Sequence, residues 1–248
     1  MGIVLMYHDI VTKDDKTSGF QNNSAFQYKV EDTAFNEQVK ALQGSDVSFT
    51  FDDGGVSFYT VVAPILEKYG FRGVFFISTK FIGTEGFVTE EQIKELHKRG
   101  HEIGSHSHSH PSNMAIMSKE EILYEWQKSA KILTDILGEP VEIASIPNGY
   151  SSKVVKESAR KAGFNRLYTS APSDKIRNRG GQRIVGRYVV HKDTSLDDVV
   201  RIVTSSTFRI KLTIRYIVLE LAKWILGSSY ISIKNRLLSH NNNTEESE

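Results

Sequence analysis

Short apolar runs alternate with amphipathic segments along most of this chain, and that alternation limits the folds open to it. Residues 3–7 and 73–77 have the length and composition of strands buried on both faces. Between such runs, apolar residues recur at helical spacing, and Thr89 and Ser118 each open a capping-box pattern. Strands that alternate with helices form parallel β/α units. We therefore expect an α/β fold, a distorted or incomplete (β/α) barrel of about seven parallel strands.

Two other segments are predicted from their local composition. Residues 11–34 are polar and read as a long loop over the mouth of the barrel, where they could shape substrate access. Residues 183–190 have the pattern of a further strand, followed by a helix over residues 196–203.

The composition excludes several classes of function. The chain has 248 residues, 39% of them hydrophobic and 25% charged, which suits one barrel-sized domain. Its 31 basic and 30 acidic residues leave a formal net charge of +1, so no nucleic acid partner is predicted. Cysteine is absent, which excludes disulfides, thiolate nucleophiles and cysteine-bound zinc. Any metal would be held by histidine and aspartate.

Three regions are expected along the chain. Residues 1–205 would form the barrel, residues 206–238 a basic amphipathic segment, and residues 239–248 a disordered polar tail. Within the second region, residues 208–226 mix four basic residues with aliphatic ones and contain one acid, Glu220. Charges interrupt this stretch too often for a transmembrane span. It could lie on an anionic membrane surface or pack on the barrel or a partner, and packing is the favoured hypothesis.

The first residues predict where the protein is located. They carry no charged region and only a short apolar run before Tyr7, which is too little for a signal peptide. The sequence as given therefore predicts a cytoplasmic protein, with peripheral membrane association through residues 208–226 as an open possibility.

One polar site is predicted where residues 48–55 end a strand. This run of β-forming residues delivers Asp52 and Asp53 to a glycine turn, as a strand does when it ends at a site. Taken alone, Asp-Asp-Gly is also an ordinary turn, because Asp and Gly tolerate the backbone that turns require. The pattern becomes informative only together with a second one.

That second pattern is a histidine cluster within residues 100–111. His106 and His110 are spaced i, i+4, and His108 lies between them, so two rings can point the same way. Neutral imidazoles and one carboxylate are the usual ligands of a catalytic zinc ion that keeps a position open for water. A second carboxylate would then be free to act as a base. A solvated histidine loop is the alternative, and it applies most directly to His108.

The two stretches together resemble the polysaccharide deacetylase family, the carbohydrate esterases that share the NodB homology domain. Thr-Phe-Asp-Asp-Gly at residues 50–54 matches the first motif of that family, and His-Ser-His-Ser-His at residues 106–110 matches the second. The resemblance covers roughly residues 1–205. It implies one divalent metal ion, zinc with cobalt, nickel or manganese as alternatives, and Asp52 as the base. The metal ligands that it implies are Asp53, His106 and His110.

Two histidines are candidates for the catalytic acid. Leu-Met-Tyr-His-Asp at residues 5–9 resembles the poly-N-acetylglucosamine deacetylase branch, in which an N-terminal histidine is the acid, and this implies His8. The fifth motif of the family, Leu-x-His, is approximated by Val-Val-His at residues 189–191, which makes His191 the alternative.

The third motif of the family is matched in part. The Pro147-Asn148 loop resembles it, and the backbone N–H that completes an oxyanion hole would come from Asn148. The family carries a base-orienting arginine two residues before this proline, where this chain has Ser145. Arg187, on a later strand, is the candidate substitute. The fourth motif, an aspartate with a downstream tryptophan, is not found in residues 165–190.

The resemblance implies a metal-dependent hydrolase that removes acetyl groups from an N-acetylated sugar, free, lipid-linked or polymeric. Two alternatives stay open: an O-acetyl esterase acting on a glycan, and a catalytically silent carbohydrate-binding domain of the same fold. A retaining glycosidase is disfavoured, because neighbouring carboxylates on one strand end cannot flank a glycosidic bond at about 5 Å.

Overall fold

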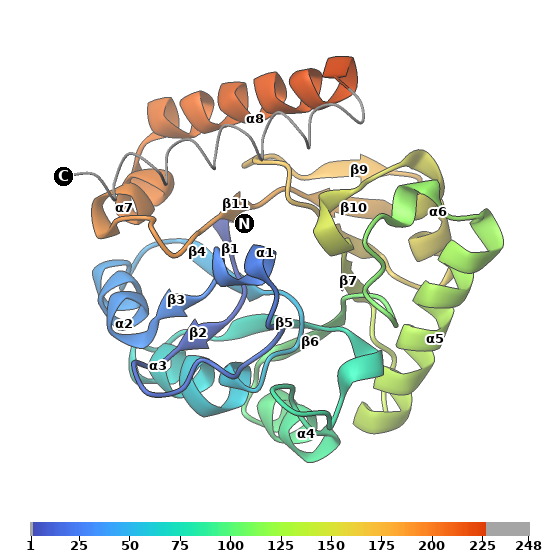
Figure 1. Cartoon of the computed structure of the whole chain (residues 1–248), viewed down its shortest axis with the longest axis horizontal. Helices are drawn as coiled ribbons and strands as arrows, with labels where there is room; N and C mark the ends of the chain where they lie inside the picture. Colours follow the sequence, from blue (N-terminus) through green and yellow to red (C-terminus); the bar gives the residue numbers. More distant parts are fainter. Residues whose placement is uncertain (1, 227–248) are drawn as a thin grey trace.

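A curled sheet of nine strands forms the centre of the molecule in the computed structural model, which describes residues 2–226 (Figure 1). Its spatial order is β11-β1-β4-β5-β6-β7-β8-β10-β9, and its pairings are parallel except that of β10 with β9. The strands are β1 (Ile3–Tyr7), β4 (Val47–Phe51), β5 (Gly73–Ile77), β6 (Glu102–Ser105), β7 (Ile143–Ser145), β8 (Arg166–Tyr168), β9 (Arg177–Arg179), β10 (Gln182–Val185) and β11 (Tyr188–Val189). The predicted fold class, an α/β fold with a distorted or incomplete (β/α) barrel, is confirmed.

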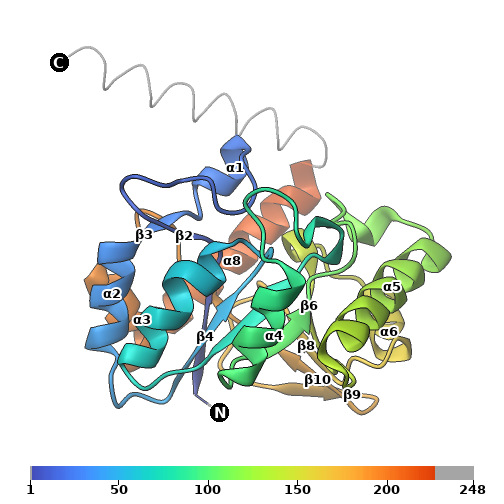
Figure 2. The ribbon, with the colours of Figure 1, turned by 90° about the horizontal axis from the view of Figure 1, so that it is seen from below.

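Helices cover the outer face of this sheet (Figures 1 and 2). Both predicted capping boxes are present, with Thr89 and Ser118 accepting hydrogen bonds from the backbone N–H three residues on, at 3.2 and 3.3 Å. The predicted tail over residues 239–248, and residues 227–238 before it, lie outside the described residues. The longer helices are α2 (Asp32–Ala41), α3 (Ala63–Lys68, entered through a π-helical turn, Phe58–Val62), α4 (Glu90–Lys98), α5 (Lys119–Leu137), α6 (Lys153–Lys161), α7 (Leu196–Thr204) and α8 (Ser206–Leu226).

The core between sheet and helices is rich in aromatic rings. Phe49, Phe51 and Phe75 are completely buried on β4 and β5, and Tyr7 stacks on Phe51 with ring centroids 5.6 Å apart. Phe35 of α2 meets Tyr7 edge-on at 5.2 Å. Burying such a side chain stabilises the fold by about 1.5–3 kcal/mol. The strands are therefore held rigidly, which fixes the positions of the residues at their ends.

Only two residues join β10 to β11, which lie on opposite sides of the gap in the barrel. β10 pairs with β8 at one side of the sheet and β11 pairs with β1 at the other, so Gly186 and Arg187 cross the gap in the barrel. The prediction of one strand over residues 183–190 is wrong at this point. A Cβ atom on Gly186 would lie 2.5 Å from the carbonyl oxygen of Ala171, which shows how closely the chain passes here.

The polar segment predicted as a loop over residues 11–34 contains short regular elements. β2 (Ile10–Val11) pairs in parallel with β3 (Val30–Glu31), and α1 (Asn23–Phe26) lies between them. Figure 2 shows α1 at the end of the barrel opposite the N-terminus. Polar contacts that a sequence pattern does not reveal hold the segment there: Ser18 Oγ donates to Asp9 Oδ1 at 2.6 Å, and Lys29 Nζ donates to the Ser18 carbonyl at 2.6 Å.

Candidate active site

Three strand ends deliver polar side chains to one cleft of about 320 Å³. β1 is followed by His8, β4 by Asp52 and Asp53, and β6 by the turn that carries His106 and His110. Parallel strands end at the same edge of a sheet, so residues far apart in the chain meet there. The rest of the lining includes Phe20, Asn22, Tyr28, Asn148, Tyr150, Ser170, Tyr216 and Glu220.

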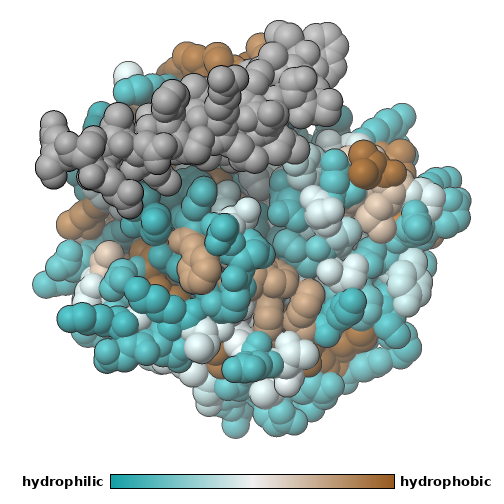
Figure 3. Space-filling view, viewed as in Figure 1, coloured by the Kyte–Doolittle hydropathy of each residue, from teal (hydrophilic) through white to brown (hydrophobic). Residues whose placement is uncertain are grey.

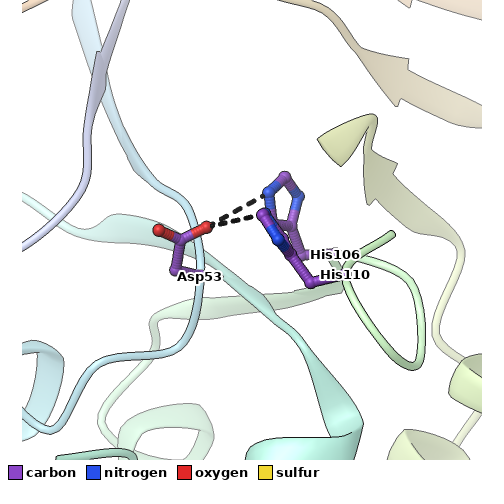
Figure 4. Close-up of side chains that lie close together, drawn as sticks. All are labelled: Asp53, His106 and His110. Atoms are coloured by element: carbon purple, nitrogen blue, oxygen red, sulfur yellow. Dashed lines mark ion pairs between the residues drawn. The ribbon is translucent and has the colours of Figure 1, made fainter. Parts of the chain in front are cut away.

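Asp53, His106 and His110 converge in this cleft (Figure 4). Asp53 Oδ1 lies 3.4 Å from His106 Nε2 and 3.2 Å from His110 Nε2. One ligand atom from each residue can be chosen so that all three lie within 4.8 Å of one another, and the part of the chain that the structure describes contains no other such group of histidine and acidic side chains. A carboxylate and two imidazoles are the donor types and the number that catalytic zinc takes from a protein.

The ionisation of Asp53 and that of His110 depend on each other. Burial opposes ionisation of Asp53, but hydrogen bonding from His106 and His110 outweighs it and holds the pKa of that carboxyl well below its usual value. Burial also disfavours the charged form of His110, yet the adjacent Asp53 carboxylate raises the pKa of this imidazole. The cluster therefore presents an ionised oxygen beside two ring nitrogens, which is an arrangement suited to binding a cation.

The backbone around the cluster is strained. Four non-glycine residues in the described part of the chain have positive φ: Asp53 at 87°, Ser107 at 66°, His110 at 53° and Asn148 at 54°. Such conformations cost energy for residues with a Cβ and are concentrated at functional sites. All four lie in or next to the cleft, so the chain accepts local strain in order to aim these side chains.

Asp52 also lines the cleft, and it is hydrogen-bonded to two buried residues of the barrel, Arg187 and Ser145. Arg187 Nη1 and Nη2 donate to its two carboxylate oxygens, both at 2.7 Å, and Ser145 Oγ donates to Oδ2 at 3.1 Å. Burial would raise the pKa of Asp52, but the buried Arg187 guanidinium outweighs it and lowers that pKa. Oδ2 lies 3.9 Å from His106 Nε2. Asp52 is thus an ionised carboxylate held next to the cluster.

His8 lies in the cleft, whereas His191 does not line it. The ring of Tyr28 contacts both, at 4.4 Å from His8 and 4.8 Å from His191 between ring centroids. His8 Nδ1 is buried and has no hydrogen-bond partner within the described part of the chain. Burial lowers the pKa of His8, although Asp53 and Asp52 oppose this effect. Of the two histidines, only His8 is placed beside Asp52 and Asp53.

The remaining predicted residues are placed as follows. Asn148 lines the cleft, and its Nδ2 donates to the carbonyl of Pro111 at 3.3 Å. Pro147 is buried and is not among the lining residues. His108 is also outside the lining, with its Nδ1 2.9 Å from Thr79 Oγ1.

Comparison with known proteins bears on the family of this chain. The profile of the polysaccharide deacetylase family matches residues 40–167, slightly more than half of the chain. The chain belongs to the polysaccharide deacetylase family. YxkH of Bacillus subtilis strain 168, which carries the same family name, is 31% identical over 188 residues, or 71% of this chain and 67% of YxkH. Poly-β-1,6-N-acetyl-D-glucosamine N-deacetylase of Staphylococcus aureus strain MSSA476 is 24% identical over 211 residues, or 66% of this chain and 71% of that enzyme.

Solved structures show the same fold at lower identity. The deacetylase PplD of Streptococcus pyogenes, determined in complex with acetate, has a TM-score of 0.65 and 19% identity over 82% of this chain and 97% of its own. IcaB of Ammonifex degensii has a TM-score of 0.64 and 20% identity over 81% of this chain and 96% of its own. These two deacetylases therefore share the fold of this family member, with its curled parallel sheet.

One residue that shapes the site was not predicted from the sequence. Glu125, buried on α5, accepts hydrogen bonds from the backbone N–H groups of His108 at 2.9 Å and Ser109 at 2.7 Å, and from Ser109 Oγ at 2.7 Å. It thereby anchors the turn between the two histidines of the cluster. The available signal was its place next to Trp126 on the buried face of α5, because an acid on such a face requires a partner.

Proposed function

We propose that this family member is a metal-dependent hydrolase that removes acetyl groups from an N-acetylated sugar or polysaccharide. The observation that carries the proposal is the convergence of Asp53, His106 and His110 in one cleft with Asp52 beside them. The names of the S. aureus and S. pyogenes relatives, an N-deacetylase and a deacetylase, support the same class of reaction.

Amide hydrolysis makes three demands, and the cleft offers a group for each. An N-acetyl group requires an activated water, stabilisation of charge on the carbonyl oxygen, and a proton for the departing amine. Asp53, His106 and His110 would hold one divalent cation, with zinc as the first choice and cobalt, nickel or manganese as alternatives. Such an ion acidifies water and polarises a carbonyl.

Asp52 is the proposed base. Its lowered pKa keeps the carboxylate ionised, and Arg187 and Ser145 fix its orientation through three hydrogen bonds. It lies next to the cluster rather than within it, so it can accept the proton of the attacking water. In this proposal Arg187 takes the orienting role for which the family uses an arginine before the third-motif proline.

His8 and Asn148 complete the proposed machinery. His8 lines the same cleft and would donate a proton to the amine nitrogen as the C–N bond breaks. Asn148, held in a left-handed conformation at the rim, would direct its backbone N–H toward the developing oxyanion. The aromatic rings of Phe20, Tyr28 and Tyr150 would give the sugar an apolar surface to lie against.

The proposal is tested by metal content and acetate release. We expect the purified protein to contain one divalent ion and to release acetate from N-acetylhexosamine oligomers, to lose this activity with a chelator, and to recover it with zinc or cobalt. His106→Ala should abolish release, whereas His97→Ala, which alters a histidine on α4 outside the cleft, should not. Release that resists the chelator would contradict the metal dependence, and no release from any acetylated glycan would favour the silent binding domain.

An O-acetyl esterase is the second candidate, and one observation favours it. Burial lowers the pKa of His8, so less of the proton donor is charged near neutral pH. An ester has a better leaving group than an amide and depends less on that proton. We expect His8→Ala to lose activity on N-acetyl substrates by about 10²–10⁴-fold and to retain it on O-acetyl substrates. Equal loss on both would show that His8 acts in some other step.

A further inference from the structure

The outward side of α8 carries a row of aliphatic residues, which we call the α8 stripe. Its members follow one another at i, i+4, i+7, i+8 and i+11, so they share one face over three turns. Each has between 50% and 60% of its surface exposed. Figure 3 shows hydrophobic surface at the upper edge of the molecule, where Figure 1 places α8. The stripe consists of Ile210, Ile214, Ile217, Val218 and Leu221.

The other side of the same helix is already engaged. Phe208 and Leu212 pack against the hydrophobic core. Tyr216 and Glu220 line the cleft that holds the Asp53 cluster. Rotating α8 to bury the stripe would therefore expose Phe208 and Leu212 and dismantle one wall of the cleft. Among the described residues, the members of the stripe do not belong to the hydrophobic core, and contiguous apolar surface of this kind marks an interaction site.

Charge beside the stripe indicates what it meets. Lys211 and Arg215 are exposed and lie next to each other along one border of the stripe. Glu220 is the only acid in α8, against four basic residues, one of which, Arg209, is paired with Asp174 of the barrel. A helix with an aliphatic face and a basic border has the pattern that binds in the plane of an anionic membrane surface.

We propose that the α8 stripe binds the surface of an anionic lipid bilayer, with Lys211 and Arg215 at the headgroups. A protein partner is less well matched, because the stripe contains only Ile, Val and Leu and none of the Trp, Tyr or Arg that dominate protein interfaces. α8 lies on the bilayer in this proposal, and no helix within residues 2–226 has the length and hydropathy to cross one. Because Tyr216 and Glu220 belong to the same helix, docking places the cleft within roughly one helix diameter, about 10 Å, of the headgroups.

Vesicle sedimentation tests the proposal on the full chain. Vesicles of phosphatidylcholine with phosphatidylglycerol are compared with phosphatidylcholine alone, without substrate and with a chelator present. We expect binding to the anionic vesicles that weakens as salt is raised. The neutral triple variant Ile210→Gln/Ile214→Gln/Val218→Gln should lower the partition coefficient at least tenfold. Lys211→Gln/Arg215→Gln should weaken binding to anionic vesicles several-fold. The matched control, Val154→Gln, changes an exposed aliphatic residue of α6 and should bind as the parent does.

Three results would overturn the proposal. They are no sedimentation of the parent protein with anionic vesicles, equal sedimentation of the triple variant, and a dimer in analytical ultracentrifugation that the triple variant abolishes, which would make a second copy the occupant. Thermal unfolding followed by circular dichroism checks that each variant is folded. Binding needs neither the cation nor turnover, so its failure would be distinct from failure of the proposed deacetylation.

Discussion

At the cleft, burial and ion pairing act on Asp52 in opposite directions. An isolated buried carboxylate favours its neutral form, whereas the Arg187 guanidinium, with two hydrogen bonds of 2.7 Å, favours the charged one. The pairing prevails, and the pKa of Asp52 is lowered. A base must be ionised to accept a proton. Arg187 therefore allows Asp52 to act as a base at lower pH than it otherwise could.

Replacing Arg187 should therefore change the pH dependence of activity. In Arg187→Met, burial acts on Asp52 without compensation, its pKa rises, and the acidic limb of the kcat/KM profile moves to higher pH. Breaking a buried ion pair should also lower the free energy of unfolding by about 3–5 kcal/mol. Arg187→Lys, which keeps the charge but not the paired hydrogen bonds, should give a smaller shift and keeps the test available if the methionine variant does not fold. Arg179→Met, on exposed β9, serves as the control. An unchanged acidic limb in a folded variant would contradict the role given to Arg187.

Helix α5 supports the histidine turn through one side chain. Glu125 accepts three hydrogen bonds from residues between His106 and His110, two of them from backbone N–H groups. Without that acceptor, buried N–H groups would lack partners, and the turn would relax into another conformation. Residues that orient metal ligands typically change metal affinity by 10–100-fold when altered.

We expect Glu125→Met to weaken zinc binding by about 10–100-fold, measured by competition with a chromophoric chelator. Methionine keeps the length of the side chain and removes the acceptors. Glu125→Gln retains a carbonyl oxygen for the backbone N–H groups and should restore most of the affinity. Glu121→Met, on the same helix but in its exposed capping box, should cost some stability and leave affinity unchanged. Similar affinities for the two methionine variants would show that Glu125 has no positioning role.

The segment that carries α1 is hydrogen-bonded to the barrel through Asp9, and the stability that Asp9 contributes depends on pH. Asp9 is buried, accepts from Ser18 Oγ at 2.6 Å and Ser57 Oγ at 3.1 Å, and burial raises its pKa to about 6 from 3.8. The folded state therefore prefers the protonated form. The stability that this preference provides is complete below pH 3.8 and is lost as pH rises through about 6.

Asp9→Asn should remove that pH dependence. Asparagine is neutral at every pH and keeps the Oδ1 acceptor, so the variant should be more stable than the parent at pH 7.5 by up to roughly 3 kcal/mol. Near pH 3.5 the two should differ little. Urea unfolding at both pH values measures the difference, with Asp14→Asn, an exposed residue of the same segment, as the control. An equal effect at both pH values would contradict the assignment of the raised pKa to Asp9.

The whole molecule shows which features a sequence can predict. Strand and helix periods and capping boxes are local, and so is the Asp-Asp-Gly turn, which is why the barrel and the positions of Asp52 and Asp53 were predictable. The pairing of Arg187 with Asp52 depends on closing the sheet between β10 and β11. The family resemblance offered Arg187 as a substitute for the missing arginine, whereas the local pattern predicted one unbroken strand there. The anchoring by Glu125 likewise joins elements that are adjacent only in the folded barrel. Local sequence patterns therefore do not predict contacts that form only when the barrel closes.

That closure leads to a prediction about the barrel as a unit. Gly186 passes the backbone of Ala171 so closely that a Cβ would lie 2.5 Å from its carbonyl oxygen, and the adjacent Arg187 reaches Asp52 across the gap. Gly186→Ala should force the segment outward, lower the free energy of unfolding by about 1–3 kcal/mol, and move the guanidinium away from the base.

Displacing a catalytic contact by about 1 Å can cost roughly 10²-fold in rate, so we expect kcat/KM of Gly186→Ala to fall at least about tenfold. Gly181→Ala is the matched control: its φ of 82° disfavours alanine, at a cost of about 1–2 kcal/mol, but nothing lies within 4 Å of the added Cβ. It should lose similar stability and keep its activity. Urea unfolding and acetate release on both variants separate the two effects. Equal activity in the two would mean that the crossing at Gly186 does not position Arg187.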